Sequence, residues 1–410
     1  MQTSLPEAFL QTATGKAADN ILRNCVHCGF CNATCPTYQL TGDELDGPRG
    51  RIYLMKQALE GQPPSTRTQL HLDRCLTCRA CETTCPSGVD YHTLLDIGRE
   101  YIEPRVRRPL LQRLRRRLLR LVLTSPRRFT PLLRVAQGLR PVLPAGLGRS
   151  IPARVPGGHA VNGRALPRTM LLLDGCVQPA LAPQINRATR RVLAALGINA
   201  VIPKGSGCCG ALSHHLTATQ EARGFMKTNI DAWWPVIEAG AEAIVISASG
   251  CAPTVKDYGR LLADEPAYAD RAARVSELAR DLSEVISAEQ PAASLKRRAS
   301  GNKIAFHSPC SLQHGQQITG IVEDLLVQSG YTLVPVADAH LCCGSAGTYS
   351  LLQPALAGQL RSNKLRALQA EQASAIVTAN IGCLTHMAGH ARVPVQHWIE
   401  LLEPLFTEAL

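Results

Sequence analysis

The sequence predicts a multi-domain protein in which a small α-helical domain precedes an α/β domain built from two tandem repeats with parallel strands. A run of four cysteines occurs twice near the amino end, a segment rich in arginine and proline follows, and a Cys-Cys-Gly pattern then occurs twice. From these three features we expect an N-terminal domain at 1–103, a connecting segment at 104–168, repeat 1 at 169–299 and repeat 2 at 300–410.

The duplicated run reads C-x2-C-x2-C-x3-C-P, with Cys25, Cys28, Cys31 and Cys35 in the first copy and Cys75, Cys78, Cys81 and Cys85 in the second. This spacing is typical of loops that hold [4Fe-4S] clusters in two-cluster ferredoxins. Three cysteines of one loop reach one cube, and the fourth, turned away by the following proline, reaches the neighbouring cube. We therefore expect one cluster on Cys25, Cys28, Cys31 and Cys85, and a second on Cys75, Cys78, Cys81 and Cys35. Zinc usually takes cysteines in pairs, and disulfides need an oxidising compartment, so both are disfavoured.

The composition and the first residues of the chain indicate the cellular compartment in which we expect the protein. The chain has 410 residues, 45% of them hydrophobic, which is ordinary for a globular protein with a packed core. Its first twenty residues lack the basic and apolar regions of a secretory signal, and no uncharged apolar run is long enough to span a bilayer. We expect a cytoplasmic location, which would also keep the sixteen cysteines reduced.

Apolar periodicity and helix signals place the elements of the N-terminal domain. We expect helices at 17–24, 48–59, 69–74 and 91–102, with a polar turn at 42–47. Pro48 stands in the first turn of the second helix and Gly61 ends it. The domain is therefore expected to resemble a small helical ferredoxin stabilised largely by its clusters.

The connecting segment is strongly basic. It holds sixteen arginines from Arg105 to Arg168 with no lysine and no acidic residue, more than the net charge of +12 of the whole chain. One helical face carries Leu110, Leu111, Leu114, Leu118, Leu121 and Val122, and the other carries Arg113, Arg116, Arg117 and Arg120, with Arg115 as the exception. Two interpretations stay open: peripheral contact of 105–140 with an anionic membrane or a partner, or a helix that is solvated or packed on its own acidic domains. Nucleic acid is disfavoured because no binding motif accompanies the arginines. Seven prolines beyond Thr124 predict an irregular linker.

The remaining sequence is an internal repeat, most visible in its cysteines. Cys176, the pair Cys208 and Cys209, and Cys251 recur as Cys310, the pair Cys342 and Cys343, and Cys383, with the first spacing equal to 32 residues in both copies. Each copy reads as strand, helix, strand, Cys-Cys-Gly turn, helix, strand, cysteine. Alternating strands and helices indicate a parallel sheet covered on both faces, with the cysteines beyond the carboxyl ends of the strands.

Two adjacent cysteines are difficult to aim at one tetrahedral ion, whereas a multi-iron cluster offers each its own iron. We therefore favour a cluster or related metal site at the Cys-Cys-Gly turns over a vicinal disulfide or core cysteines, and treat these eight cysteines as additional candidate ligands. Gly205, Gly207 and Gly210 match a dinucleotide-binding pattern, but repeat 2 keeps the cysteines and loses two of these glycines. We expect no flavin or nicotinamide site on this chain.

The chain resembles, over its full length, the family of glycolate oxidase (glycolate dehydrogenase) iron–sulfur subunits. The resemblance rests on ILRNCVHCGFCNATCPTYQLTGDELDGPRGRIYLMKQALEG (21–61), HLDRCLTCRACETTCPSGV (71–89), DAWWPVIEAGAEAI (231–244), LCCGSAGTYSLL (341–352) and VTANIGCLTH (377–386). The cysteine pattern alone is shared with anaerobic glycerol-3-phosphate dehydrogenase and heterodisulfide reductase subunits. The sequences between the cysteines make the match specific.

The resemblance implies a ferredoxin domain followed by paired CCG domains in an oxidoreductase complex. FAD-binding partner subunits would oxidise glycolate to glyoxylate, and this chain, with no catalytic residue of its own, would pass electrons to an acceptor such as quinone at the cytoplasmic side of the inner membrane. Glycerol 3-phosphate, lactate or a heterodisulfide are the alternative substrates. A metal-stabilised docking protein without electron transfer is the alternative from another functional class.

The chain departs from the heterodisulfide reductase type of CCG domain at one position in each repeat. That type ends each repeat in Cys-x-x-Cys, and Thr254 and His386 replace the second cysteine here. A five-thiolate cluster is therefore not supported. His386, His307 and His314 are conceivable extra ligands, but we leave them out of the expected site because lone histidines near strands more often have structural roles.

Overall fold

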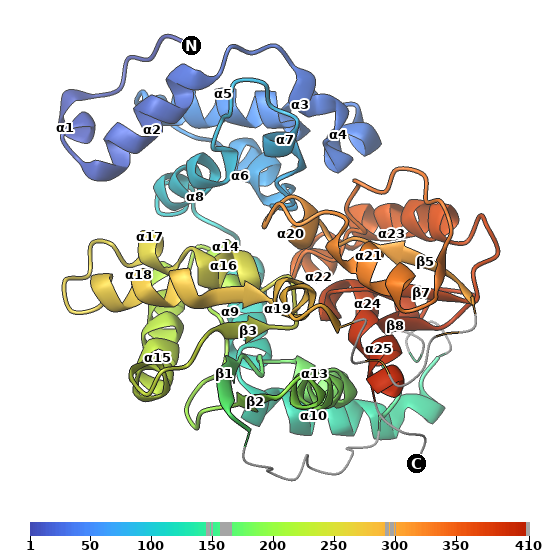
Figure 1. Ribbon diagram of the computed structural model, residues 1–410. Helices are drawn as coiled ribbons and strands as arrows, with labels where there is room; N and C mark the ends of the chain where they lie inside the picture. Colours follow the sequence, from blue (N-terminus) through green and yellow to red (C-terminus); the bar gives the residue numbers. More distant parts are fainter. Residues whose placement is uncertain are drawn as a thin grey trace.

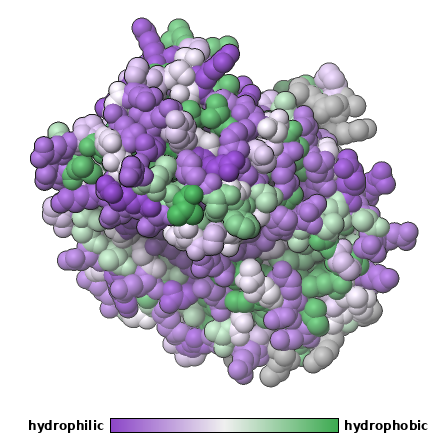
Figure 2. Space-filling model, turned by 90° about the horizontal axis from the view of Figure 1, so that it is seen from above, coloured by the Kyte–Doolittle hydropathy of each residue, from purple (hydrophilic) through white to green (hydrophobic). Residues whose placement is uncertain are grey.

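The computed structural model describes residues 1–144, 148, 151–155, 166–291, 295, 299 and 301–406. The N-terminal helical domain lies above the two repeats, which stand side by side beneath it (Figure 1). Hydrophilic residues cover most of the face seen from above, with hydrophobic residues in small groups between them (Figure 2). No helix within the described residues is both long and apolar enough to cross a membrane.

The N-terminal domain is helical, as predicted. Its elements are α1 (Glu7–Leu10), α2 (Ala13–Asn24), α3 (Phe30–Ala33), α4 (Pro36–Thr41), the 3₁₀ turn η1 (Glu44–Asp46), α5 (Pro48–Leu59), α6 (Thr66–Asp73), α7 (Ala80–Thr83) and α8 (Tyr91–Ile102). The predictions for α5 and α8 are confirmed. Both α2 and α6 begin earlier than predicted, because Thr12 accepts a hydrogen bond from the Gly15 amide and Ser65 forms a capping box with Thr68.

The connecting segment forms α9 (Leu110–Leu123), α10 (Pro126–Leu139) and the 3₁₀ turn η2 (Arg140–Val142). The amphipathic helix is confirmed, but the irregular linker predicted beyond Thr124 is wrong over α10. Pro126 occupies the first turn, where its missing N–H removes no helical bond, and Pro131 is exposed on the surface. Part of the predicted linker, 145–147, 149–150 and 156–165, lies outside the described residues.

Each repeat contains a four-stranded, fully parallel sheet, with strand order β2-β1-β3-β4 in repeat 1 and β6-β5-β7-β8 in repeat 2. Repeat 1 consists of β1 (Arg168–Leu172), α12 (Gln178–Leu181), α13 (Pro183–Ala195), β2 (Ile198–Val201), α14 (Ala211–His215), α15 (Thr219–Glu238), β3 (Ile244–Ile246), α16 (Ala252–Lys256), α17 (Tyr258–Leu261), α18 (Ala269–Leu278), β4 (Ala279–Asp281) and α19 (Leu282–Ala288). Repeat 2 consists of β5 (Lys303–His307), α20 (Cys310–Gln313), α21 (Ile321–Gln328), β6 (Thr332–Leu333), α22 (Tyr349–Leu352), α23 (Pro354–Leu368), β7 (Ala375–Thr378), α24 (Ile381–Ala388), β8 (Val395–His397) and α25 (Trp398–Phe406). The predicted parallel sheets are confirmed, while β4 and β8 have no counterpart among the predicted strands.

The two repeats share a hydrophobic core. Along β1, Met170 and Leu172 face a cluster that also contains Trp398 and Val377 of repeat 2, while Leu171 faces the opposite side of the sheet. The loops that follow β3 and β7 also meet, since the Ser249 amide donates to the Ala379 carbonyl at 3.1 Å. The carboxyl ends of both central strands are thereby held close to each other.

Polar contacts attach the N-terminal domain to both repeats. Arg79 donates to Asp257 of repeat 1 at 3.2 Å. His214 Nε2 lies 3.0 Å from Asp96 Oδ2, across the same interface. On the other side, Thr83 Oγ1 lies 2.9 Å from His314 Nδ1 of repeat 2. The domain thus contacts both repeats, and its second cysteine loop packs against the Cys-Cys-Gly turn of repeat 2 through Leu76 and Cys78.

Candidate metal centres

The first hollow of the N-terminal domain brings together cysteines from both runs. Its lining includes Cys25, Cys28 and Cys31 of the first run, together with Cys81 and Cys85 of the second. The predicted set of Cys25, Cys28, Cys31 and Cys85 therefore surrounds one space.

The second hollow is complementary. Cys35 of the first run lines it with Cys75, Cys78 and Cys81 of the second, together with Arg51, Tyr91 and other side chains. Helix α4 begins at the proline after Cys35, whereas a turn follows Cys85, and each of these two cysteines lines the hollow of the other run. Both predicted sets of four thus gather around separate hollows, with Cys81 bordering both.

The two cysteine loops share an unusual backbone. Two residues after the first cysteine, His27 and Thr77 have φ of 55° and 52°, and two residues further on, Gly29 and Arg79 have φ of 85° and 59°. Left-handed conformations at non-glycine residues cost roughly 1 kcal/mol or more each and are concentrated at functional sites. This conformation turns amides toward sulfur, since the Thr77 N–H donates to Cys75 Sγ at 3.4 Å. Thiols and inward amides are the donor set that a cubane cluster requires.

A buried charged network adjoins the second hollow. Arg51 is 1% exposed and donates to the His71 carbonyl at 2.7 Å and to Thr37 Oγ1 at 3.1 Å. Asp46 lies 2.8 Å from both His71 Nδ1 and Arg74 Nη1. The guanidinium of Arg51 places a positive charge near Cys35 and Cys75, and its Nη1 lies 4.0 Å from Cys35 Sγ. Sequence reasoning missed this network, although a charge at Arg51 on the helix face shared by Met55 and Leu59 was a signal.

Burial raises the pKa of the Cys78 and Cys81 thiols well above the ordinary value. Such thiols stay neutral unless a metal takes the place of the proton, so binding of a metal would release protons.

The two hollows differ in their access to solvent. Cys28 is exposed, and Val26 and Phe30 beside it are 67% and 63% exposed. At the second hollow, Cys78 instead packs with Cys310 against an apolar cluster that includes Cys342, Leu76 and Tyr349. One hollow therefore opens to the surface, and the other abuts repeat 2.

In repeat 1 the four predicted cysteines form a chain of contacts. The Cys176 thiol is hydrogen-bonded to that of Cys208, and the Cys209 thiol is hydrogen-bonded to those of both Cys208 and Cys251. Gly210, with φ of 88°, sends its N–H to Cys208 Sγ at 3.4 Å. The left-handed glycine thus directs the turn back over the cysteine pair.

Repeat 2 reproduces this arrangement. Cys310 Sγ lies 3.6 Å from Cys342 Sγ, and Cys343 contacts both Cys342 and Cys383. Gly344 has φ of 89°, and its N–H lies 3.4 Å from Cys342 Sγ. The predicted position of both sets beyond the carboxyl ends of parallel strands is confirmed. In each turn the four thiols therefore follow one another in a chain of pairwise contacts.

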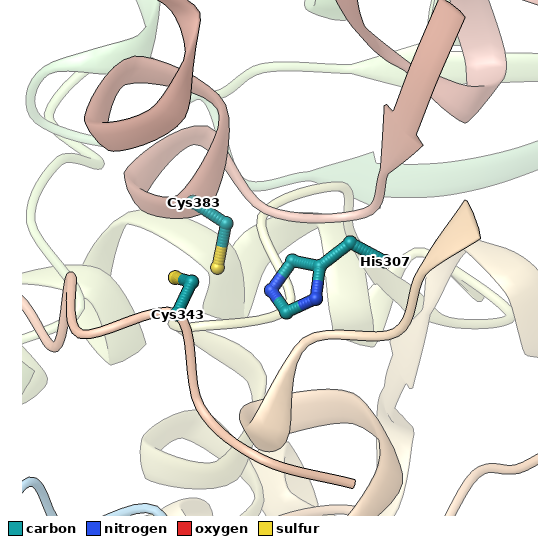
Figure 3. Close-up of side chains that lie close together, drawn as sticks. All are labelled: His307, Cys343 and Cys383. Atoms are coloured by element: carbon teal, nitrogen blue, oxygen red, sulfur yellow. The ribbon is translucent and has the colours of Figure 1, made fainter. Parts of the chain in front are cut away.

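The structure separates the three histidines near repeat 2. His314 is hydrogen-bonded at both ring nitrogens, to Thr83 and to the His340 carbonyl, and His386 Nε2 lies 3.3 Å from the Ala357 carbonyl. His307 instead faces Cys343 and Cys383, with one ligand atom of each residue within 4.8 Å of the others (Figure 3). Burial lowers the pKa of His307 to about 3, so its ring is neutral at physiological pH.

Family models match the two parts of the chain. Residues 21–89 match the model described as a 4Fe-4S dicluster domain. Residues 170–256 and 304–388 each match the model described as a cysteine-rich domain. The first match supports iron–sulfur clusters in the N-terminal domain, and the second covers both Cys-Cys-Gly turns.

Curated relatives cover nearly the whole chain. The glycolate oxidase iron–sulfur subunit of Escherichia coli K12 is 54% identical over 408 residues, 98% of each chain. The probable glycolate oxidase iron–sulfur subunit of Bacillus subtilis 168 is 31% identical over 398 residues, 89% of this chain and 88% of the relative. Lactate utilization protein A of Bacillus licheniformis is 25% identical over 237 residues, 55% of this chain and 95% of the relative.

The length and identity of the first match exceed what a shared cysteine pattern alone would give, and it includes the connecting segment as well as the cysteine sites. With a 4Fe-4S dicluster domain followed by two cysteine-rich domains, the chain belongs to the family of glycolate oxidase iron–sulfur subunits.

Proposed function

We propose that this chain carries electrons within a glycolate oxidase complex, from glycolate oxidised to glyoxylate on an FAD-binding partner subunit to an acceptor such as the quinone pool. The observation that carries the proposal is the crossing of the two cysteine runs, so that each hollow is completed by a cysteine of the other run. The 54% identity to the Escherichia coli subunit supports the choice of glycolate.

The proposed ligands of one [4Fe-4S] cluster are Cys25, Cys28, Cys31 and Cys85, and those of the second are Cys35, Cys75, Cys78 and Cys81. Such clusters supply one-electron carriers, whose potentials depend on hydrogen bonds to sulfur, charge and burial. The chain provides these factors: left-handed loops aim amides at sulfur, and Arg51 holds a positive charge beside Cys35 and Cys75. No nucleophile or acid–base residue of this chain is needed, because substrate chemistry belongs to the partner.

We assign the direction of electron transfer from the difference in solvent exposure between the two cysteine hollows. We place the contact with the flavin subunit at the exposed loop around Cys28, where Val26 and Phe30 offer apolar surface. The second hollow would pass electrons toward repeat 2, because Cys78 packs near Cys310 and Cys342. The Cys-Cys-Gly turns of both repeats are proposed as further iron–sulfur or related metal sites.

Substitution of single ligands tests the path. Cys28→Ser and Cys78→Ser should abolish glycolate-dependent reduction of dye or quinone by the complex, while the flavin subunits stay folded. Ser87→Ala, which alters the lining of the first hollow without removing a sulfur, is the matched control and should retain activity. Unimpaired turnover in both cysteine variants would contradict the proposal.

An anaerobic preparation separates electron transfer from a purely structural role. Iron and sulfide with reducible low-temperature EPR signals are expected, whereas zinc without redox signals would indicate a metal-stabilised docking protein. A tag on this chain should recover a flavin subunit that oxidises glycolate. Recovery of a lactate-oxidising partner would favour the second candidate, a lactate-linked subunit, to which relatives covering 55% of this chain point. Recovery of a glycerol-3-phosphate or heterodisulfide enzyme would likewise replace glycolate.

We also propose that 105–140 attaches the complex peripherally to the inner membrane at its cytoplasmic side. On α9, Leu114 and Leu118 are 62% and 55% exposed, whereas Arg116 is buried against the N-terminal domain. Exposed Arg113 and Arg117 flank the leucines, and exposed leucines bordered by arginine suit an anionic lipid surface.

Flotation with vesicles tests this attachment. Leu114→Gln with Leu118→Gln should weaken binding to anionic vesicles by about tenfold or more, because two leucines no longer enter the lipid. Val327→Gln, at an apolar residue 54% exposed on α21, is the control and should leave binding unchanged. Release by high salt would indicate that charge dominates, and equal binding of all three proteins would contradict a role for the leucines.

A further inference from the structure

The ring of His307 is enclosed at the end of β5, one of the two inner strands of the repeat 2 sheet. It is 2% exposed, and Cys343 and Cys383 beside it are 0% and 3% exposed. The sulfur of Cys383 points into the space between Cys343 and the imidazole (Figure 3). One ligand atom from each of these three residues lies within 4.8 Å of the other two.

Neither ring nitrogen of His307 has a hydrogen-bond partner, although both are buried. Among the histidines that the structure describes, this is true of His307 alone. His397, which is equally enclosed, is satisfied at both nitrogens, by the Ser247 carbonyl and the Ile399 amide. Buried polar groups are almost always paired, so an imidazole with two unpaired nitrogens facing thiols calls for a ligand.

Repeat 1 shows that the fold does not require an imidazole here. Leu173 precedes Cys176 by the same three residues that separate His307 from Cys310, and it packs in the core beside Cys209. Four thiols of the turn are present in both repeats, so the histidine is an additional donor atom in repeat 2.

A second difference between the two repeats also supports a metal centre of a different kind in repeat 2. Lys364 follows Cys342 by 22 residues, the spacing at which Ile230 follows Cys208 in repeat 1. Lys364 is 3% exposed and donates to the Asp338 carbonyl at 2.7 Å. Burial lowers the pKa of Lys364, and negative charge on Cys342, Cys343 and Cys310 opposes this, so a charged Lys364 would offset the negative charge of several thiolates.

The neighbouring groups already contribute hydrogen bonds to the sulfur atoms. The Gly344 amide donates to Cys342 Sγ at 3.4 Å, and Asn380 Nδ2 donates to Cys383 Sγ at 3.5 Å. Donors around the ligand sulfurs orient them and tune a bound metal.

We infer that His307, through a ring nitrogen, joins Cys310, Cys342, Cys343 and Cys383 as a ligand of an iron–sulfur cluster in repeat 2, whereas the centre of repeat 1 has thiolate ligands alone. This inference rests on the proposed electron-transfer function and specifies the ligands of one of its centres. Five donors exceed the four of a tetrahedral zinc site, which favours a cluster with several irons. A neutral imidazole adds no negative charge at this fifth position, whereas a thiolate there would add one, so a cysteine in place of His307 should lower the reduction potential of the cluster.

The test uses the full chain, prepared without oxygen from cells supplied with ¹⁵N-histidine. Pulsed EPR should detect a histidine nitrogen coupled to a cluster, and the coupling should disappear in His307→Leu, which copies repeat 1. His307→Cys guards against simple misfolding, since it should retain iron and sulfide, lose the nitrogen coupling and lower the potential of that cluster. His386→Gln, at a nearby histidine engaged with a carbonyl, should leave the coupling intact.

A wild-type spectrum without histidine coupling, or a coupling that persists in His307→Leu, would overturn the inference. Zinc in place of iron at repeat 2 would overturn it as well. The proposed function would be contradicted by a different measurement, in which a complex that contains every cluster receives no electrons from glycolate. Because ligand identity and electron delivery are measured separately, the two failures are distinguishable.

Discussion

Single residues fix the geometry of the Cys-Cys-Gly turns, and Gly344 shows why. Its φ of 89° suits glycine, and a Cβ there would lie 2.8 Å from both the Ala357 carbonyl oxygen and Leu360 Cβ. A side chain at position 344 would therefore combine backbone strain with steric overlap, because α23 packs directly against the turn.

Gly344→Ala should therefore lower the free energy of unfolding by roughly 1–3 kcal/mol and reduce the metal content of repeat 2. Gly358→Ala, in α23, is the matched control: a Cβ there meets nothing within 4 Å, and alanine should stabilise the helix by about 0.5–1 kcal/mol. Urea denaturation followed by circular dichroism under anaerobic conditions compares the two. Equal stability of both variants would contradict the strain argument.

At this scale, the sequence was informative where chemistry is local. Cysteine spacing is a property of one short loop, so the eight candidate ligands could be predicted from residue numbers, while their division between two clusters stays a prediction. The difference between His307, His314 and His386 depends on which distant groups lie beside each ring, and no local pattern records this. Arg51 was missed for the same reason, since its partners lie on other elements.

Among the elements, α9 combines features of the two interpretations left open by its amphipathic pattern. The described arginines at its inner side pair with the protein's own carboxylates: Arg116 with Asp73 at 3.5 Å and Arg120 with Glu221 at 3.4 Å. The leucine face points outward. The helix thus packs on its own acidic domains through arginine, and the outward leucines remain as surface for lipid or a partner.

Substitution of Arg108, just before α9, tests how strongly ion pairs hold this helix on the N-terminal domain. Its guanidinium is 5% exposed and pairs with both Asp73 and Glu103. Arg108→Met should lower the free energy of unfolding by roughly 3 kcal/mol, at the low end for buried pairs because both carboxylates are partly exposed. Arg113→Met, at an exposed arginine, should change it by less than about 0.5 kcal/mol. Thermal unfolding of both variants provides the measurement, and similar losses would contradict the pairing.

Element prediction succeeded where caps and apolar periodicity agree, as in α5 and α8. It missed β4 and β8, which are only three residues long and lie at sheet edges, because so short a run carries no distinct alternation. It also missed α10, because Pro126 lies in the first turn, where proline removes no helical hydrogen bond, and because the helix continues through Pro131 in its interior.

At the scale of the whole molecule, His92 joins the N-terminal domain to repeat 1. Its Nδ1 lies 2.8 Å from Asp90 and 3.1 Å from Glu82, and its Nε2 lies 3.6 Å from Asp257. Burial alone would lower the pKa of His92, but its hydrogen bonds to these three carboxylates raise it to about 11.

A raised pKa means that the protonated ring stabilises the folded state. This stabilisation is complete below the pKa of an unfolded histidine, about 6.5, and is lost as pH rises toward 11. Between pH 7 and pH 11 the melting temperature should therefore fall more steeply for the wild type than for His92→Gln. His340→Gln, at a partly exposed histidine outside this interface network, should follow the wild type. Parallel curves for wild type and His92→Gln would contradict the assignment.

The arrangement of domains could not be predicted from sequence. Domain order and the parallel sheets follow from repeats and periodicity, which are local signals. The placement of the N-terminal domain depends on contacts such as Arg79 with Asp257 and Thr83 with His314, which join residues far apart in the chain. Only the folded molecule shows that Cys78 lies beside the thiols of repeat 2.

Cys28 is exposed whereas Cys78 is partly buried, and this difference affects how the chain reacts with oxygen. Dioxygen reaches the outer loop first, so bleaching of the isolated chain should begin there and reach the inner sulfur atoms later. A flavoprotein seated over Val26 and Phe30 would act as a shield as well as a donor. The assembled complex should accordingly keep its brown colour under aeration longer than the lone subunit does.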